Sequence, residues 1–310
     1  MSFIAGVGIT NVDLLYQNMP RIPAAGEEVY TDRFSLQLGG GLPATLINLG
    51  RLGIPTKIAT ELGDDLFSGF AKAQFEENGV QPVNLYHGSD IPLNITSAII
   101  LKNDRSFITY GKSDMQPDDA AKEAFYQMAS GAKLCLMSPG GFLDVYRKLK
   151  AEGTLMVLDM GWDDELSFEK YASEFEIADI YTPNRKEALK LTGCSTPLEA
   201  AKALQKHFSR VVVKVDKDGC IGIDEAGAFF CKSEDAFKNV DSTGAGDAFL
   251  AGLCYGLYHD RPLRDCVAFG NITGGKAVTQ VGALSAYVTE PELLTLSEKL
   301  EYTVLNPERF

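Results

Sequence analysis

The stretch from Asp241 to Asp247 reads Asp-Ser-Thr-Gly-Ala-Gly-Asp, which is a composition suited to binding an anion next to a carboxylate. Gly244, Ala245 and Gly246 carry almost no side chain, so a ligand can approach their backbone closely. The helix that we expect to begin here has unpaired N–H groups at its start, and these favour a phosphate or the negative charge of a transition state. Asp247 stands where those amides converge and could accept a proton from an attacking hydroxyl. The spacing alone fits a helix-capping aspartate equally well.

The elements that would position this turn alternate along the chain. From residue 118 onward, segments with helical periodicity alternate with short apolar strands, which indicates βαβ units and a mainly parallel sheet. Helices are also predicted at 42–53, 247–258, 262–278 and 291–301. The predicted fold class is therefore α/β, with a doubly wound, mainly parallel sheet flanked by helices in a single domain over residues 1–310.

Four further segments do not belong to this alternation of strands and helices. Within each of them apolar and polar residues alternate, as they do in half-buried strands. They lie at about 12–17, 27–37, 94–101 and 106–111. We predict that they pair into a small β-sheet lid that projects from the main sheet. No linker rich in Pro, Gly or Ser separates them, so the lid strands are expected to be insertions, at about 12–37 and 94–111, within one domain.

The bulk composition excludes several classes of function. The formal net charge of -13 and the pI near 4.8 argue against a nucleic-acid binder, which needs basic patches to neutralise phosphates. The first residues lack the pattern of a signal peptide, and no apolar run approaches the roughly 18 residues of a membrane span. The six cysteines show no C-x-x-C spacing and are expected to be reduced thiols. We therefore expect a cytoplasmic protein that engages neither a nucleic acid nor a membrane.

Two segments resemble the signatures of one family. The segment Asp241–Asp247 resembles the C-terminal signature of ribokinase-like (pfkB family) carbohydrate kinases, and the glycine-rich segment Leu38–Gly53 resembles their N-terminal signature. Order, spacing and length agree over essentially the whole chain, lid strands included. The resemblance implies a ribokinase-like fold and ATP-dependent transfer of a phosphoryl group to a hydroxyl.

The resemblance also implies roles for individual residues. Asp247 would be the catalytic base, and the amides of the 244–246 turn would form the anion hole. Asp13, beside Asn11, matches a ligand of substrate hydroxyls at the end of the first strand. Gly39 and Gly40 match the diglycine that lets the sugar approach the backbone. For Asn11 and Asp13, ordinary turn chemistry is the alternative interpretation.

One position departs from the family pattern. The asparagine that usually follows the diglycine as a sugar ligand is replaced by Ala44, and Thr45 is the neighbouring polar residue that could take its place. The identity of the substrate is therefore left open. If this pocket has lost one hydrogen-bonding group, Ala44→Asn is expected to tighten binding of ribose or fructose.

The nucleotide is expected on the other side of Asp247. Asn184 and Glu187 form the family's N-x-x-E pair and, three residues apart on a helix, could both reach one hydrated Mg²⁺. A capping pair is the alternative. Lys214, at the end of an apolar strand, could contact the phosphates, and Asn271 lies in the stretch that lines the family's adenine pocket.

A monovalent cation is implied for some members of the family. The segment Ala277–Ala283 resembles the loop whose carbonyls bind K⁺ in those members, together with two residues of the C-terminal signature. The expected ligands of K⁺ here are Asp241, Thr243, Ala277, Gln280 and Gly282.

The function predicted from these residues is that of a sugar kinase with Mg²⁺ and ATP as cofactors. It would transfer the γ-phosphoryl group to a hydroxyl of a small fructose- or ribose-like sugar, as a fructokinase or ribokinase does. A nucleoside kinase of the same family is one alternative, because it shares nearly every motif. A degenerate kinase that acts as a sugar-binding sensor is another, although a sensor has no need of Asp247. Lid strands with one apolar face further predict a homodimer through the lid.

Overall fold

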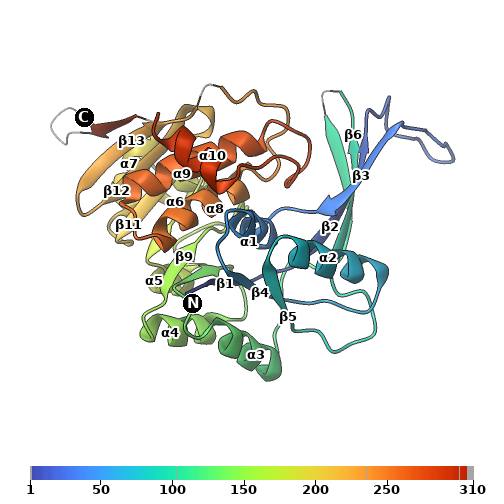
Figure 1. Ribbon diagram of the computed structural model, residues 1–310, viewed down its shortest axis with the longest axis horizontal. Coiled ribbons are helices and arrows are strands. Elements are labelled where there is room, and N and C mark those ends of the chain that lie inside the picture. The colour runs from blue at the N-terminus through green and yellow to red at the C-terminus, as the bar shows by residue number, and fades with distance from the viewer. Residues whose placement is uncertain (1, 103, 235, 300, 306–310) are drawn as a thin grey trace.

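A computed structural model describes residues 2–102, 104–234, 236–299 and 301–305. A ten-stranded sheet runs through the molecule in the order β5-β4-β1-β8-β9-β10-β11-β12-β13-β14 (Figure 1). Its strands are β1 (Ile4–Val7), β4 (Thr56–Thr60), β5 (Val80–Asn84), β8 (Leu134–Met137), β9 (Leu155–Leu158), β10 (Ile180–Tyr181), β11 (Arg210–Lys214), β12 (Gly219–Asp224), β13 (Gly227–Lys232) and β14 (Tyr302–Leu305). Neighbours from β5 to β11 pair in parallel, and the last three strands join antiparallel.

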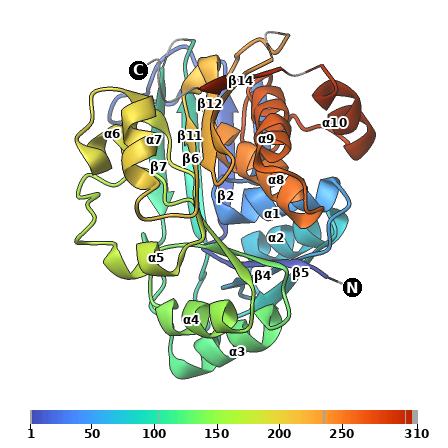
Figure 2. The same cartoon turned by 90° about the vertical axis from the view of Figure 1, so that its left-hand side faces the viewer.

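Helices cover both faces of this sheet, which confirms the predicted doubly wound α/β class (Figure 2). One face carries α1 (Leu42–Arg51), α2 (Leu66–Glu77), α8 (Ala245–Tyr258), α9 (Leu263–Ala277) and α10 (Glu290–Ser297). The other face carries α3 (Asp119–Ala129), α4 (Leu143–Ala151), α5 (Ala172–Ile177), α6 (Arg185–Thr192) and α7 (Pro197–Leu204). Each face has its own cluster of buried apolar side chains. Within the described part of the chain, every helix falls short of the length and apolar character needed to cross a bilayer.

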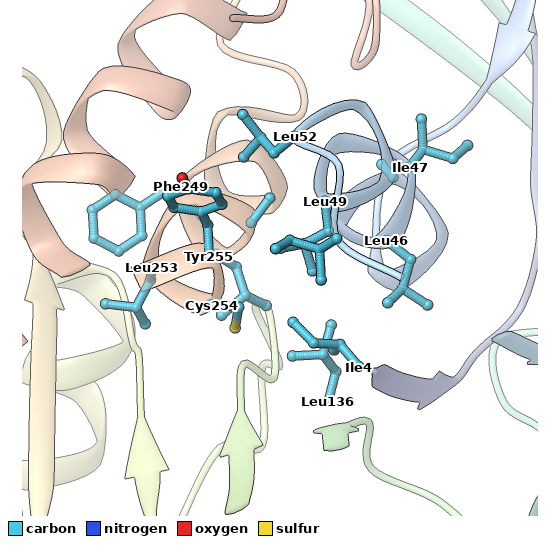
Figure 3. Packing of buried hydrophobic residues seen from close by; sticks show 14 of the residues in the cluster. Ile4, Leu46, Ile47, Leu49, Leu52, Leu136, Phe249, Leu253, Cys254 and Tyr255 are labelled. Atoms are coloured by element: carbon cyan, nitrogen blue, oxygen red, sulfur yellow. The ribbon is translucent and has the colours of Figure 1, made fainter. Parts of the chain in front are cut away.

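The packing of α8 fixes the position of the anion-binding turn at its N-terminus. Leu49 of α1 and Ile4 of β1 pack in the same cluster as Phe249 and Leu253 of α8 (Figure 3). On another side, a Cβ added at Gly252 would lie 2.4 Å from the carbonyl oxygen of Phe269, so α9 can only approach this closely because the residue is glycine. Helix α8 is therefore apolar almost all round because other elements surround it.

A separate four-stranded sheet projects from the main one, as the alternating segments predict (Figure 1). Its order is β3-β2-β6-β7, with bounds β2 (Asn11–Gln17), β3 (Arg33–Leu38), β6 (Asn94–Ile100) and β7 (Arg105–Tyr110). The inner pair β2 and β6 is parallel, and the outer strands are antiparallel to them. We call these four strands the lid. The strand predicted over 27–37 begins only at Arg33, because β2 ends opposite that residue and the chain before it has no partner strand.

The two faces of the lid differ in character. The register places Asp13, Gln37 and Thr96 on one face, which we call the inner face. The opposite, outer face carries large apolar side chains that remain exposed, by 55% for Phe34, 38% for Leu36, 68% for Ile108 and 55% for Tyr110. A monomeric protein rarely exposes several large apolar side chains on one face of a small sheet.

The C-terminal part differs from the sequence-based prediction. Helix α10 ends at Ser297, not at residue 301, and the chain then forms β14 along the free edge of β13. No strand is predicted from the sequence of residues 302–305. Of its four residues, three are exposed, so it lacks the alternating burial by which half-buried strands are recognised.

Candidate active site

The candidate site lies at the carboxyl ends of the parallel strands, where the strand order reverses between β4 and β8 on either side of β1. Ligands of doubly wound folds bind at such a switch point. A cavity of about 990 Å³ opens there. Its polar lining includes Thr45, Asp159, Asn184, Glu187, Lys214 and Asp247, and its apolar and aromatic lining includes Ile9, Met115, Phe142, Met160, Trp162 and Tyr171.

Asp247 lies in the first turn of α8 and lines this cavity. Its Oδ2 accepts a hydrogen bond of 2.8 Å from the backbone N–H of Gly41. A Cβ added at Gly40 would lie 2.8 Å from the same oxygen, so the diglycine lets the backbone reach the carboxylate. Burial raises the pKa of Asp247 to about 7, with a further rise from the charge of Asp159, against the opposing effects of the Gly41 N–H and Lys214. A carboxylate with a pKa near 7 is suited to accept a proton at neutral pH.

The glycine turn before Asp247 is held by a neighbouring loop. Gly244 has a φ of 76°, in the left-handed region that favours glycine, and a Cβ there would lie 2.6 Å from the Cα of Ala283. Ala245 begins α8 and its N–H donates to the carbonyl of Ser242 at 3.3 Å, whereas the N–H groups of Gly246 and Asp247 have no intrahelical partner. A Cβ at Gly246 would come within 3.8 Å of the Lys214 Nζ and of no other atom at that range. The turn and the ammonium group therefore lie near each other, as an anion site requires.

Lys214 forms a salt bridge with Asp159 at the wall of the cavity. Its Nζ donates to Oδ2 of Asp159 at 2.6 Å, and both side chains are less than a fifth exposed. Burial alone would lower the pKa of Lys214, but the charge of Asp159, together with those of Glu187 and Asp247, raises it above its ordinary value. The lysine is thus charged and fixed at one wall of the cavity.

Asn184 and Glu187 form a complete capping box at the start of α6. Each side chain accepts a hydrogen bond from the other residue's backbone N–H, and Asn184 Nδ2 also donates to Glu187 Oε1 at 2.6 Å. Both residues also line the cavity, and burial raises the pKa of Glu187. The capping interpretation is therefore correct, and it places two oxygen-bearing side chains at the cavity wall at the same time.

Asn11 and Asp13 lie in the first half of β2, at the base of the lid, and are not among the residues that line the cavity. Asn11 Nδ2 donates to Asp13 Oδ1 at 2.5 Å, and Thr96 donates to Asn11 Oδ1 at 3.0 Å. A Cβ at Gly39 would lie 2.4 Å from Asn11 Nδ2 and 3.0 Å from both Asp13 oxygens. Burial raises the pKa of Asp13 to about 6, partly offset by the bond from Asn11. The fold thus brings Asn11, Asp13, Gly39 and Gly40 to the same side of Asp247.

Other predicted residues are committed to contacts within the protein. Thr45 is buried and donates to the backbone carbonyl of Asp247 at 3.2 Å, which joins α1 to α8. Asn271 is buried and donates to the carbonyls of Cys231 and Lys232, while its Oδ1 accepts from Cys220. Their roles as ligands of sugar and nucleotide stay predictions.

Ala44 is fully buried in the apolar cluster and is absent from the lining of the cavity. An asparagine at this position would place an amide among apolar side chains, which is costly without partners. The geometry therefore favours destabilisation by Ala44→Asn over the tighter sugar binding that the sequence suggested.

Sequence reasoning missed the apolar and aromatic wall of the cavity and Arg105, which contacts Asp241 from the lid. The wall comes from four loops that are far apart in sequence, around residues 9, 115, 142 and 160–171, and no local pattern marks any of them. Arg105 is the first residue of a short alternating strand, where a solvent-exposed lysine or arginine is common, so its type alone does not indicate a contact. In the described ranges, no three His, Cys, Asp or Glu side chains are arranged to hold a metal by themselves.

Comparison with known proteins agrees with this geometry. The sequence pattern of a family described as pfkB family carbohydrate kinase matches residues 1–290. The chain is 23% identical to a ribokinase of Mus musculus over 287 residues, covering 88% of each. It is 27% identical to an aminoimidazole riboside kinase of Salmonella typhimurium, covering 84% of this chain and 88% of that protein. The structure of Arabidopsis thaliana ribokinase complexed with ribose and ATP superposes with a TM-score of 0.79 at 22% identity, covering 96% of this chain and 99% of the other.

Proposed function

Because the chain belongs to the pfkB family of carbohydrate kinases, we propose that it transfers the γ-phosphoryl group of ATP to a hydroxyl of a small ribose- or fructose-like sugar. The observation that carries the proposal is the carboxylate of Asp247. It lies at the N-terminus of α8, has a pKa raised to about 7, and faces a cavity that the glycine turn and Lys214 also border. A base and an anion site side by side are what phosphoryl transfer to a hydroxyl needs.

The sugar is proposed to bind between Asp247 and the base of the lid. Asp13 and Asn11 offer oxygen atoms to its hydroxyl groups, and the missing side chain of Gly39 leaves room beside them. Gly40 keeps the path to Asp247 open on the same side. A sugar held here would present one hydroxyl to the Asp247 carboxylate.

The phosphates are proposed to lie against the turn of residues 244–246 and the Lys214 ammonium group. Helix N-termini and fixed lysines bind anions even in a protein of net negative charge. Mg²⁺ fits the oxygen donors that Asn184, Glu187 and Asp159 place along the cavity wall, since this ion prefers oxygen ligands and keeps several waters. When bound with ATP, Mg²⁺ would neutralise part of the phosphate charge.

In the proposed step, the substrate hydroxyl oxygen forms a bond to the γ-phosphorus while the bond from that phosphorus to the β–γ bridging oxygen breaks. The hydroxyl proton passes to Asp247, and ADP keeps the electron pair of the broken bond. The turn amides and Lys214 stabilise the negative charge on the transferred group.

A nucleoside kinase is a second candidate, and the aromatic side chains of the cavity favour it. Phe142, Trp162 and Tyr171 line part of its wall. A base attached to the sugar could stack on such a wall. The aminoimidazole riboside kinase among the relatives acts on a riboside according to its name.

We further propose a homodimer through the outer face of the lid. Four large apolar side chains exposed on one sheet face support this assembly. The six free cysteines, five of them buried, support a reducing and therefore cytoplasmic location.

An ADP-release assay tests the function and separates the two candidates. The purified protein with Mg²⁺ and ATP is offered aldopentoses, ketohexoses and nucleosides one at a time. The proposal expects ADP release that depends on one class of small sugar and is absent without it. Release with nucleosides alone would favour the second candidate, and no release with any of them would reject both.

A further inference from the structure

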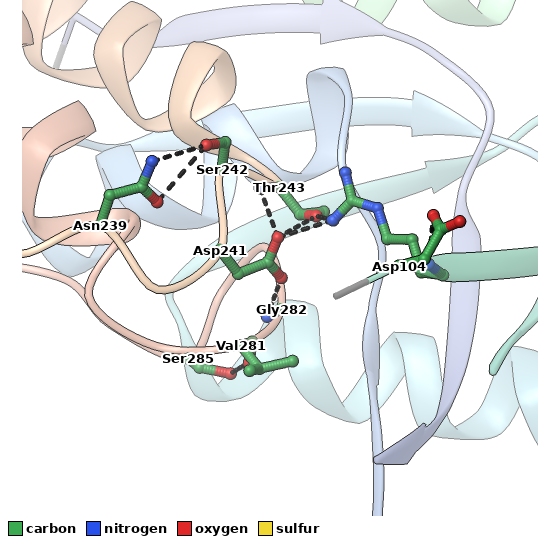
Figure 4. Close-up of polar contacts among 9 residues, drawn as sticks. Asp104, Asn239, Asp241, Ser242, Thr243, Val281, Gly282 and Ser285 are labelled. Atoms are coloured by element: carbon green, nitrogen blue, oxygen red, sulfur yellow. Dashed lines mark hydrogen bonds and ion pairs between the residues drawn. The ribbon is translucent and has the colours of Figure 1, made fainter. Parts of the chain in front are cut away.

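A lid arginine contacts the loop that precedes the anion-binding turn. Arg105, the first residue of β7, places Nη1 2.7 Å from Asp241 Oδ1 and 2.6 Å from Thr243 Oγ1. The contacts of Asp241 and Thr243 are drawn in Figure 4. The Arg105 side chain is 43% exposed, whereas the Asp241 side chain is only 11% exposed. A nearly buried carboxylate therefore receives its counter-charge from a different part of the fold, 136 residues away in sequence.

Two of the five residues expected to hold a monovalent cation, Asp241 and Thr243, are engaged by donors in this arrangement. Asp241 Oδ1 accepts from Arg105 and from the backbone N–H of Thr243, and Asp241 Oδ2 accepts from the N–H of Gly282 at 3.0 Å. Arg105 Nη1 contacts a side-chain oxygen of each, Asp241 Oδ1 and Thr243 Oγ1, so these two residues do not fit a bound K⁺ while Arg105 is in place.

The loop is connected to the catalytic turn on one side and to the lid on the other. Thr243 precedes Gly244, whose Cα abuts Ala283 on the side where a Cβ would be. A Cβ at Gly282 would lie 2.2 Å from the Gln37 Nε2 of β3, and Ser285 donates to Gln37 Oε1 at 3.3 Å. Both Arg105 and Gln37 lie on the inner face of the lid. Movement of the lid would therefore also displace the turn that carries the anion-binding amides.

We propose that Arg105 is a positioning residue that replaces a monovalent cation: from the lid it supplies the positive charge that orders residues 241–243 and so holds the turn of residues 244–246 in place. A guanidinium suits this role because it is always charged, weakly hydrated and able to bind two oxygens at once. Opening of the lid would remove the charge and loosen the turn, so the anion hole is complete only when the lid covers the sugar. Wild-type activity then needs no added monovalent cation.

Three variants and two salts test this. Arg105→Met removes the charge and keeps the length of the side chain, Arg105→Lys keeps the charge, and Arg33→Met is the matched control. Arg33 lies on the same face of the lid, and its guanidinium makes no hydrogen bond or ion pair with the described residues. Sugar phosphorylation is measured in potassium chloride and in choline chloride at equal ionic strength.

We expect wild type and Arg33→Met to have the same kcat in both salts. Arg105→Met should lose about tenfold in kcat in choline chloride, as for a half-exposed charge-assisted hydrogen bond, and recover part of it in potassium chloride. The KM for ATP should change little, because the residues that line the cavity are untouched. Arg105→Lys should retain more kcat than Arg105→Met. Strong activation of wild type by K⁺, or an Arg105→Met variant indistinguishable from wild type, would overturn the proposal.

The kinetic part rests on the proposed function, so a second readout is independent of it. The thermal midpoint of each protein is measured without substrate in the same two salts. K⁺ should stabilise Arg105→Met specifically and leave wild type and Arg33→Met unchanged. Absence of that shift rejects the replacement of a cation by Arg105 whatever the substrate is. Absence of phosphorylation with the shift present rejects the proposed function instead.

Discussion

Replacing Asp247 by asparagine should stabilise the folded protein while it removes activity. The carboxylate is kept near the start of α8 at an energetic cost, since burial raises its pKa from 3.8 to about 7. The asparagine side chain is isosteric with aspartate, and its oxygen can still accept the N–H of Gly41 that Oδ2 accepts now at 2.8 Å. What the substitution removes is therefore the charge alone.

The magnitude follows from the pKa. The rise of the Asp247 pKa from 3.8 to about 7 corresponds to about 4 kcal/mol of unfavourable free energy for the ionised carboxylate, at roughly 1.4 kcal/mol for each pKa unit. Water that enters the cavity and relaxation of nearby groups reduce this, so we expect the free energy of unfolding to increase by about 1–3 kcal/mol at about pH 8. Because the folded-state pKa is raised, protonation of Asp247 stabilises wild type. That stabilisation is full below 3.8 and is lost as the pH rises through about 7.

Urea unfolding of both proteins at about pH 8 and about pH 5 measures the difference. The advantage of the variant should shrink by about half at the lower pH, where wild type is protonated in its folded state. Asp241→Asn is the matched control, for which we expect a change in the free energy of unfolding of the opposite sign. Burial raises the pKa of Asp241, but hydrogen bonds from Gly282 and Thr243 and the charge of Arg105 outweigh it and leave that pKa lowered, so its loss should destabilise at about pH 8. An Asp247→Asn protein no more stable than wild type at about pH 8 would refute the reasoning, as would a pH-independent difference.

Three more predictions concern rate, packing and assembly. The kcat/KM for the sugar should fall with the ionised fraction of Asp247 below about pH 7 and level off above it, as a pH–rate profile would show. Ala44→Asn should lower the free energy of unfolding by about 1–3 kcal/mol in urea melts, because it buries an amide at a position with 0% exposure; tighter sugar binding at unchanged stability would contradict this. Light scattering at micromolar concentration should give a dimer, and Ile108→Asp on the outer lid face a monomer; a monomeric wild type would count against the lid interface.

Local sequence patterns predicted the parts of the site that depend on backbone conformation. The turn of residues 244–246 and the diglycine at 39 and 40 are recognisable because only small residues allow the close approaches that the fold contains. The lid strands were also predicted, because apolar and polar residues alternate along them as they do in strands that pair into a two-sided sheet. Asn184 and Glu187 show the limit of such patterns, since one spacing of three serves a helix cap and a cavity wall together.

Contacts between distant segments could not be predicted from the sequence. Arg105 meets Asp241 only because β7 folds back over the loop before α8, and nothing near residue 105 reports this. The same holds for Trp162 and Tyr171, whose place in the cavity depends on four converging loops. Strand β14 joins the sheet through its backbone to β13, a pairing that leaves no signal in side-chain type.

Transfer of the terminal phosphoryl group from labelled ATP to the sugar, compared in wild type and Asp247→Asn, tests the central claim most directly. ATP affinity is measured in parallel by calorimetry. The account predicts that kcat falls by about 10²–10⁴-fold while ATP affinity persists, because proton acceptance is lost and the turn and Lys214 remain. A variant that keeps more than about a third of the wild-type kcat would show that Asp247 only caps α8.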